Sequence, residues 1–180
     1  MIIRRVPEDC LVQEHLVDSF TATIRPERGV CQFGLYKLHK TSLTTPQATA
    51  MLAKHLGCYP SSVQHAGLKD KHAVTSQYVT VGPVPPSVAL PPKVHLGGMS
   101  ATQAGFVAQG IDSRAIKANE FTLVVRSASK GDVADVNQRV AAMATSPQRD
   151  ALLFVNYFGD QRFGSARHGE GFAAALAIKG

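Results

Sequence analysis

The sequence predicts an α+β fold with helices packed on one sheet, because extended and helical patterns alternate along the chain. Alternating apolar and polar side chains indicate strands over residues 10–16, 32–38, 73–81 and 121–126. Between the second and third of these strands, apolar residues recur at helical spacing after Thr45. With 180 residues, 44% of them hydrophobic, the chain can bury its own core, which favours a single domain.

The helix after Thr45 has signals at both of its ends. Thr45 is the expected N-cap, Pro46 the expected first helical residue and Gly57 the expected end. The apolar stripe that should pack on the sheet comprises Ala48, Met51, Leu52 and Leu56. A short strand over residues 61–66 then leads into a polar turn.

The elements after this turn are predicted from fewer signals. Residues 82–92 contain five prolines, so we expect a connector there, whereas residues 95–110 give no clear pattern. Asp132 is the expected cap of a helix whose core-facing residues are Val133, Val136, Val140 and Met143. A buried strand or helix end is expected over residues 152–155, and a final helix after Gly171 with Phe172, Ala175 and Leu176.

The charge balance favours a polyanionic partner without identifying one. Nineteen Lys and Arg side chains against thirteen Asp and Glu give a formal charge of +6 at pH 7. Such a balance is typical of nucleic-acid-binding proteins but also occurs in basic proteins that bind none. No stretch approaches the roughly 18 apolar residues of a membrane span. Glu8 and Asp9 stand where a secretory signal needs an apolar run.

Cysteine, histidine and glycine usage argues against several kinds of site. Cys10, Cys31 and Cys58 include no Cys-x-x-Cys pair, so neither a disulfide framework nor a structural zinc site is expected, and a reducing intracellular compartment fits. The seven histidines form no His-Glu-x-x-His pair. Residues 29–34 have the glycine spacing of a phosphate loop but lack its Lys and Ser or Thr. We therefore expect no metal, no cofactor and no nucleotide triphosphatase activity.

Residues 66–77, AGLKDKHAVTSQ, place one carboxylate, Asp70, between Lys69 and Lys71 in a turn that Gly67 allows. Neighbouring cations favour the charged form of an acid, so Asp70 suits a nucleophile or a base better than a proton donor. A Lys-Asp-Lys turn between two strands is also common as a plain solvated loop. The residue types alone leave both interpretations open.

Four stretches of the chain resemble the TruD family of pseudouridine synthases. Residues 66–77 resemble the family's signature motif, in which a glycine, a Lys-Asp pair, a small residue, a threonine and a glutamine recur at this spacing. Residues 156–164, NYFGDQRFG, resemble its NYFGxQRFG motif, and residues 119–121, NEF, resemble its NxF motif. Pro-Glu-Asp at residues 7–9 resembles the opening strand. The resemblance covers nearly the whole chain.

The resemblance implies a pseudouridine synthase catalytic fold with a mostly antiparallel central sheet, of which residues 1–180 would form the N-terminal portion. It implies RNA, most of all tRNA, as the partner, and isomerisation of a flipped-out uridine without a metal or a cofactor. Family members continue through an inserted domain and then return to complete the sheet. The chain would therefore be the first half of a longer protein, a chain completed by a second one, or a catalytically silent RNA-binding or assembly protein.

The resemblance also carries over roles for individual residues. Asp70 would be the essential aspartate, acting either as nucleophile at C1′ or as base on the 2′ proton, and Arg4 would pair with it. Phe121 would stack on the flipped base, and Asn119 would anchor the active-site backbone or the base. Gln161 and Arg162 are expected to support the pocket or contact phosphate. The candidates for contacts with backbone phosphates are Lys69, Lys71, Lys37, Lys40 and Arg167.

Alternatives to these roles stay open, and the chain departs from the family pattern at three positions. Phe121 also fits a core aromatic on a strand, and Arg4 also fits a disordered terminal arginine. Cys10 stands where the family usually has phenylalanine, Ala118 where a glycine precedes the asparagine, and His168 near an expected asparagine. The first change removes core volume, and the second restricts the backbone near the pocket.

Overall fold

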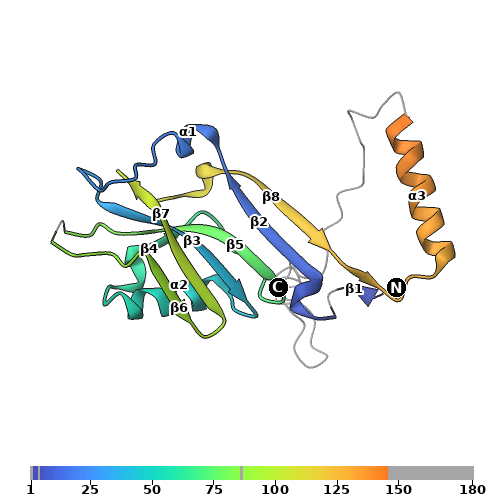
Figure 1. Ribbon diagram of the computed structural model, residues 1–180, viewed down its shortest axis with the longest axis horizontal. Coiled ribbons are helices and arrows are strands. Elements are labelled where there is room, and N and C mark those ends of the chain that lie inside the picture. The colour runs from blue at the N-terminus through green and yellow to red at the C-terminus, as the bar shows by residue number, and fades with distance from the viewer. Residues whose placement is uncertain (1, 4, 86, 146–180) are drawn as a thin grey trace, which may run out of the picture. The chain divides into compact units, whose positions relative to one another are not determined.

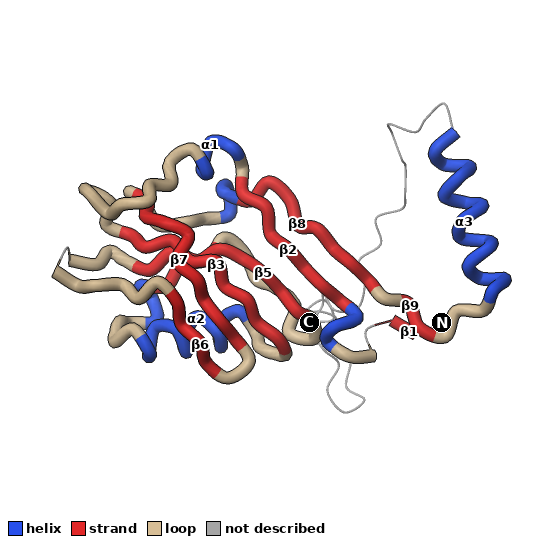
Figure 2. Tube along the Cα trace, in the orientation of Figure 1, coloured by secondary structure: helices blue, strands red, loops and turns tan. Residues whose placement is uncertain are grey.

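The structure, a computed structural model, describes residues 2–3, 5–85 and 87–145. These residues fall into two units that divide after Ser129. The first unit contains a seven-stranded mixed sheet, a two-stranded sheet and the helix α2 (Thr45–His55), and the second contains α3 (Lys130–Thr145) (Figures 1 and 2). The predicted α+β class is confirmed.

The larger sheet has the strand order β6-β7-β3-β5-β2-β8, and β4 pairs with the second half of β5. Within the described residues β2 and β5 form the single parallel pair of this sheet, which confirms the mostly antiparallel arrangement. On the described chain, β8 pairs on one side only, with β2. The strands are β2 (Cys10–Leu16), β3 (Phe33–Thr41), β4 (Val63–His65), β5 (Val74–Val81), β6 (Lys93–Leu96), β7 (Met99–Val107) and β8 (Ile116–Leu123).

Several boundaries differ from the sequence prediction. β3 continues to Thr41, three residues beyond the expected end. The strand expected over residues 61–66 is divided between a 3₁₀ turn (Pro60–Ser62) and β4. The strand expected over residues 121–126 begins earlier, at Ile116, and its last residues form β9 (Val125–Arg126), which pairs with β1 (Ile2–Ile3).

Residues 95–110, which gave no clear pattern, supply most of the β6–β7 hairpin. Leu96 pairs with Met99, so Gly97 and Gly98 form a two-residue turn between the strands. Gly98 has a φ of +76°, a conformation that side-chain-bearing residues rarely adopt. Two adjacent glycines therefore form a tight hairpin turn of the kind that two-residue loops require.

The helix α2 begins one residue earlier than predicted. Its N-cap is Thr44, whose Oγ1 accepts a hydrogen bond from the Gln47 amide at 3.2 Å, while Gln47 Oε1 accepts one from the Thr44 amide at 2.9 Å. This reciprocal pair is a capping box. Thr45 is therefore the first helical residue, which leaves its hydroxyl available for other contacts. Gly57, with a φ of +65°, follows the helix end as expected.

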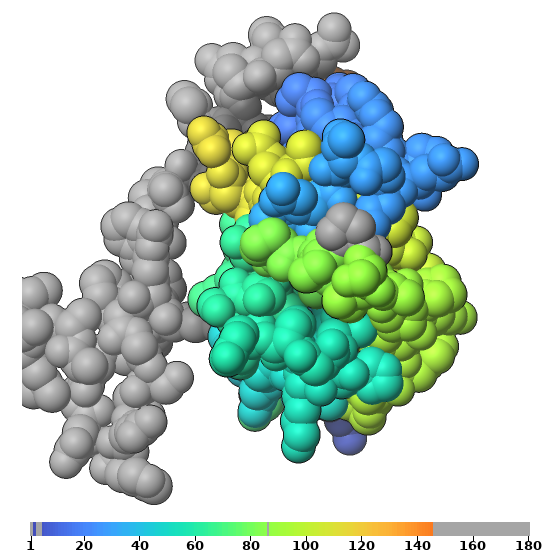
Figure 3. Space-filling model, turned by 90° about the vertical axis from the view of Figure 1, so that its left-hand side faces the viewer, coloured from blue at the N-terminus to red at the C-terminus, as the bar shows by residue number. Residues whose placement is uncertain are grey.

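The main core lies between α2 and the face of the sheet formed by β3, β5 and β7. Ala48 and Leu52 of α2 are fully buried there against residues that include Leu38 and Val79. The proline-rich connector packs against the same cluster through Val84 and Leu90. In Figure 3 the green segment lies beside the teal segment that contains α2. Tyr36 Oη donates a hydrogen bond to the Pro91 carbonyl at 2.8 Å.

The prediction of a helix at α3 is confirmed. Its apolar stripe is about half exposed: Val133 50%, Val136 50%, Val140 58% and Met143 48%. That this stripe faces a core stays a prediction. None of the helices in the described part of the chain is both long and apolar enough to span a membrane.

Some expectations fall outside the described residues. They are the elements at 152–155 and after Gly171, the NYFG motif, and the candidate site residues Arg4, Gln161, Arg162 and Arg167.

Candidate active site

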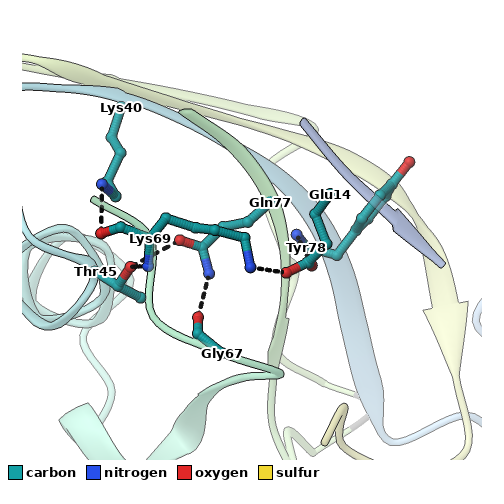
Figure 4. A network of polar contacts seen from close by, with 7 residues as sticks. All are labelled: Glu14, Lys40, Thr45, Gly67, Lys69, Gln77 and Tyr78. Atoms are coloured by element: carbon teal, nitrogen blue, oxygen red, sulfur yellow. Dashed lines mark hydrogen bonds and ion pairs between the residues drawn. The ribbon is translucent and has the colours of Figure 1, made fainter. Parts of the chain in front are cut away.

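The turn that carries Asp70 is held by three buried side chains, Lys40, Thr45 and Gln77, which we call the loop clamp (Figure 4). Lys40 Nζ donates to the carbonyls of Lys69 at 3.3 Å and Asp70 at 2.8 Å. Thr45 Oγ1 accepts from the Lys69 amide at 2.9 Å. Gln77 Nε2 donates to the carbonyl of Gly67 at 3.1 Å. Backbone groups on three residues of the turn are thus bound by side chains that are at most 1% exposed.

The clamp joins three elements of the fold. Lys40 lies on β3, Thr45 is the first residue of α2, and Gln77 lies on β5. Thr45 Oγ1 also donates to Gln77 Oε1 at 2.9 Å, and Lys40 also donates to the Leu43 carbonyl at 2.7 Å. Because buried polar groups are costly when unpaired, this mutual bonding explains how three polar side chains are accommodated in the interior.

Lys69 contributes a second anchor, a buried ion pair with Glu14 of β2. Its Nζ lies 2.5 Å from Glu14 Oε2, and both side chains are almost fully buried. The other carboxylate oxygen of Glu14 accepts a hydrogen bond from the Tyr78 amide at 2.9 Å. Lys69 and Lys40 were expected to contact phosphate, but their ammonium groups are buried against protein acceptors. The structure gives both residues a role in holding the turn.

Asp70 itself is half-buried. Its carboxylate acts on the neighbouring ammonium of Lys40: burial lowers the pKa of Lys40 to about 8, while attraction by Asp70 raises that pKa and repulsion by Lys69 lowers it further. The Asp70 carboxylate therefore lies within electrostatic reach of the clamp.

Asn119 and Phe121 lie on the same face of the sheet as the clamp. In the β2–β8 register, Glu14 faces Asn119 and Val12 faces Phe121. Directly opposed residues share a face, and this row continues from Val12 through Thr75 of β5 to Lys40 of β3. Three strand spacings of about 4.8 Å separate the backbones of Lys40 and Phe121 by about 14 Å. Residues far apart in sequence thus border one stretch of the sheet.

Phe121 is 56% exposed, so among the described residues it is not a core aromatic. Lys71, next to Asp70, is exposed and remains available to a ligand. Lys37 is an odd number of residues from Lys40 along β3, so it points to the opposite face of the sheet. Its Nζ lies 5.9 Å from the centroid of the Tyr78 ring. Lys37 is therefore on the face away from the Asp70 turn.

Sequence reasoning missed a buried anchor close to Arg4. The Asp9 carboxylate is buried and forms an ion pair with Arg126, whose Nε donates to both oxygens at 2.9 Å. Asp9 Oδ2 also accepts from the amides of Arg5 and Val6. The hydrogen bond from Arg126 holds the pKa of Asp9 below its usual value. This contact ties the segment at Arg5 and Val6 to β9.

One signal could have indicated the buried ion pair between Glu14 and Lys69. In an alternating strand that buries Cys10, Val12 and Leu16, Glu14 occupies an inward position. A carboxylate at such a position predicts a buried cationic partner, although the partner's identity requires the fold. Within the described residues, no group of three or more His, Cys, Asp or Glu side chains is placed to hold a metal ion.

Comparison with known proteins identifies the family of the chain. The family model of tRNA pseudouridine synthase D (TruD) matches residues 1–180. The chain is 32% identical over 178 residues to the tRNA pseudouridine synthase D of Anaeromyxobacter dehalogenans, covering 97% of this chain and 45% of that protein. It is 30% identical over 145 residues to the mouse (Mus musculus) pseudouridylate synthase PUS7L, covering 78% of this chain and 20% of that protein.

A solved structure shares the fold. The crystal structure of the putative tRNA pseudouridine synthase D (TruD) from Methanosarcina mazei matches with a TM-score of 0.66 and 23% identity, covering 92% of this chain and 35% of that one. The chain spans less than half the length of these curated relatives. Since the family model extends over all 180 residues, the chain belongs to the tRNA pseudouridine synthase D (TruD) family.

Proposed function

We propose that the complete protein isomerises uridine to pseudouridine in RNA, with tRNA as its substrate and Asp70 as its catalytic carboxylate. The observation that carries this proposal is the loop clamp. Its buried side chains bond the Gly67 carbonyl, the amide and carbonyl of Lys69, and the Asp70 carbonyl. A reacting group needs such fixed placement, because small displacements reduce rates strongly. Membership of the family and the names of the relatives support the same activity.

The reaction is balanced without an external reagent. The bond between N1 of the base and C1′ of the ribose breaks, the base turns, and a bond forms between C5 and C1′. The proton on C5 leaves, and N1 gains one, so substrate and product are isomers. Asp70 either attacks C1′ as a nucleophile or removes the 2′ proton as a base, and both roles need its ionised form.

Phe121 and Asn119 provide a site for the base. A uridine within an RNA stack is out of reach of a turn held against a sheet, so the nucleotide must be flipped out of the stack. Phe121 is exposed on the face that the clamp borders, and a flat ring in that position can stack on the everted base. Asn119, the cross-strand neighbour of Glu14, is proposed to bond the base or the active-site backbone.

The remaining assignments concern binding and orientation. We propose that Arg4 pairs with Asp70, since the residues after Arg4 are anchored by Asp9. Lys71 is proposed to contact the RNA backbone, and Gln161 and Arg162 to support the pocket or contact phosphate. Phosphate contacts of this kind contribute affinity and salt dependence rather than choice of sequence.

The test is to incubate the complete protein with a tRNA transcript and map pseudouridine in the wild type, in Asp70→Asn and in a matched control, Asp112→Asn. Asp112 is an exposed carboxylate of the same unit, bonded to Arg114. We expect product from the wild type and from Asp112→Asn, and a loss of at least about 1,000-fold in Asp70→Asn, because removing a single group that performs the chemistry has effects of this size.

Product formation at equal rates by the wild type and Asp70→Asn would remove Asp70 from its proposed role. Absence of product from the wild type, combined with retained RNA binding, would favour the catalytically silent RNA-binding protein.

A further inference from the structure

We propose that Lys40 is a positioning residue for the reaction: its charged ammonium fixes the carbonyls of Lys69 and Asp70, and turnover requires that charge. This inference rests on the proposed function, because it concerns the same carboxylate. Lys40 does not reach the substrate, since it is 1% exposed and its ammonium donates to the backbone carbonyls of Leu43, Lys69 and Asp70. It acts through the turn that carries Asp70.

The number of donors on Lys40 matches the number of acceptors around it. Its Nζ bonds three carbonyl oxygens, those of Leu43, Lys69 and Asp70, at 2.7, 3.3 and 2.8 Å. An ammonium carries three N–H donors, whereas a neutral amine carries two and a lone pair. Deprotonation therefore removes the donor from one carbonyl and places a lone pair against it. Two of the three carbonyls belong to the Lys-Asp pair, so the catalytic residue's own backbone is affected.

The surroundings of Lys40 place this deprotonation within reach of ordinary buffers. Burial lowers the pKa of Lys40 to about 8, and the charged groups that act on it are Asp70, which favours the ammonium, and Lys69, which opposes it. Glu14, on β2, neutralises Lys69 through their ion pair. The charge on Lys40 is thus maintained at neutral pH and is lost in mildly alkaline solution.

Activity and stability should change in opposite directions with pH. The pKa of Lys40 is about 8 in the folded chain, against an ordinary value of 10.5. Between these values the unfolded chain binds more protons at this site, so the contribution of Lys40 to folding stability rises with pH. Over the same interval the positioning ammonium is lost. A decline in turnover that accompanies a gain in stability cannot result from unfolding.

The first experiment compares Lys40→Met with Lys54→Met in the complete protein. Lys54 is an exposed lysine of α2 that lies outside the site. Single-turnover rates at saturating tRNA should fall at least tenfold in Lys40→Met and stay unchanged in Lys54→Met, since a displacement of 1 Å at a reacting group can cost about 100-fold. The dissociation constant for tRNA should be the same in both variants. Circular dichroism and urea denaturation measure the folded fraction.

The second experiment is the pH profile between pH 6.5 and 9.5, a range chosen to bracket a pKa of about 8. The wild-type single-turnover rate should fall about tenfold per pH unit above the break, as expected when one protonated group is required. In Lys40→Met the remaining rate should show no break there. The wild-type midpoint for urea denaturation, relative to that of Lys40→Met, should move upward over the same pH range. The break in the wild-type rate can be measured even if Lys40→Met has little activity.

Chemical rescue provides a conservative test. Lys40→Ala removes three methylenes and the ammonium, a fragment equivalent to propylammonium. Added propylammonium should restore the rate saturably, whereas propanol, of similar size but neutral, should not. Equal rescue by both compounds would show that Lys40 only fills space and would overturn the proposal.

The outcomes separate this inference from the proposed function. Product that depends on Asp70 but is retained in Lys40→Met, or retained without a break to pH 9.5, would overturn the role of Lys40 alone. A rate loss in Lys40→Met that matches its loss of folded protein would also overturn it. Absence of product from the wild type would overturn the proposed function and the role of Lys40 together.

Discussion

β5 and β8 flank the same strand, β2, yet their surroundings differ completely. On β5, six of the eight residues are buried and the other two are half-buried, and Gln77 supplies a clamp side chain. On β8, every residue after Ile116 is exposed, including Phe121 and Leu123. One half of the sheet therefore fixes the Asp70 turn, while the described residues of the adjacent half leave β8 accessible to a ligand or to another polypeptide segment.

The largest difference between the two halves should appear at their glutamates. We expect Glu14→Ala to lower the free energy of unfolding by about 3–5 kcal/mol, because it leaves the buried Lys69 ammonium without a counter-ion. Glu120→Ala on β8 is the matched control, since Glu120 pairs with His15 in an exposed contact of 2.8 Å. Exposed pairs contribute about 0–1 kcal/mol. Urea denaturation of both variants measures the contrast, and equal losses would contradict it.

A smaller contrast should appear at two leucines. Leu52→Ala, in the core between α2 and the sheet, is expected to lower the free energy of unfolding by about 2–5 kcal/mol, because the cavity it leaves cannot fully collapse. Leu123→Ala on β8 should cost about 1 kcal/mol or less, since that side chain is 50% exposed. Thermal or urea denaturation tests both. A comparable loss at Leu123 would mean that another part of the complete protein covers β8.

The smallest stability effect should be found at Phe121, with a large effect on catalysis. We expect Phe121→Ala to change the free energy of unfolding by about 0.5 kcal/mol or less, because the ring is 56% exposed. The single-turnover rate should fall much more than tRNA affinity, since only one of many RNA contacts is lost. Tyr59→Ala, at an aromatic residue that is 80% exposed, is the control. Equal losses of rate and affinity in Phe121→Ala would indicate a binding role alone.

The halves also differ in what the sequence could predict. The sequence pattern located β2 and β5 almost to the residue. Burial alternates along β2, whereas nearly every side chain of β5 is buried. The start of α2 was misplaced by one residue because Thr44 and Thr45 are both good caps, and the structure uses Thr45 in the clamp. For α3, periodicity predicted the helix and its apolar face, but periodicity does not specify what packs against such a face.

The site was predictable in its residue types but not in its contacts. The Asp70 turn and Phe121 were identified by resemblance to family motifs. The buried roles of Lys40, Lys69 and Gln77 depend on cross-strand register and on the position of α2, which single positions in a sequence do not specify. Asp9 and Arg126 are 117 residues apart, so no local pattern could have paired them.

Within the part of the chain that the structure describes, one side of β8 is unpaired, and this has a practical consequence for handling the polypeptide. Along that side, backbone donors and acceptors are exposed next to apolar side chains, which is the arrangement that recruits a strand from a neighbouring molecule. A polypeptide that ends at Thr145 should therefore self-associate as its concentration rises. Sedimentation velocity at several loading concentrations would reveal such assembly, and a lysine substituted for Thr122 would be the simplest way to restrain it.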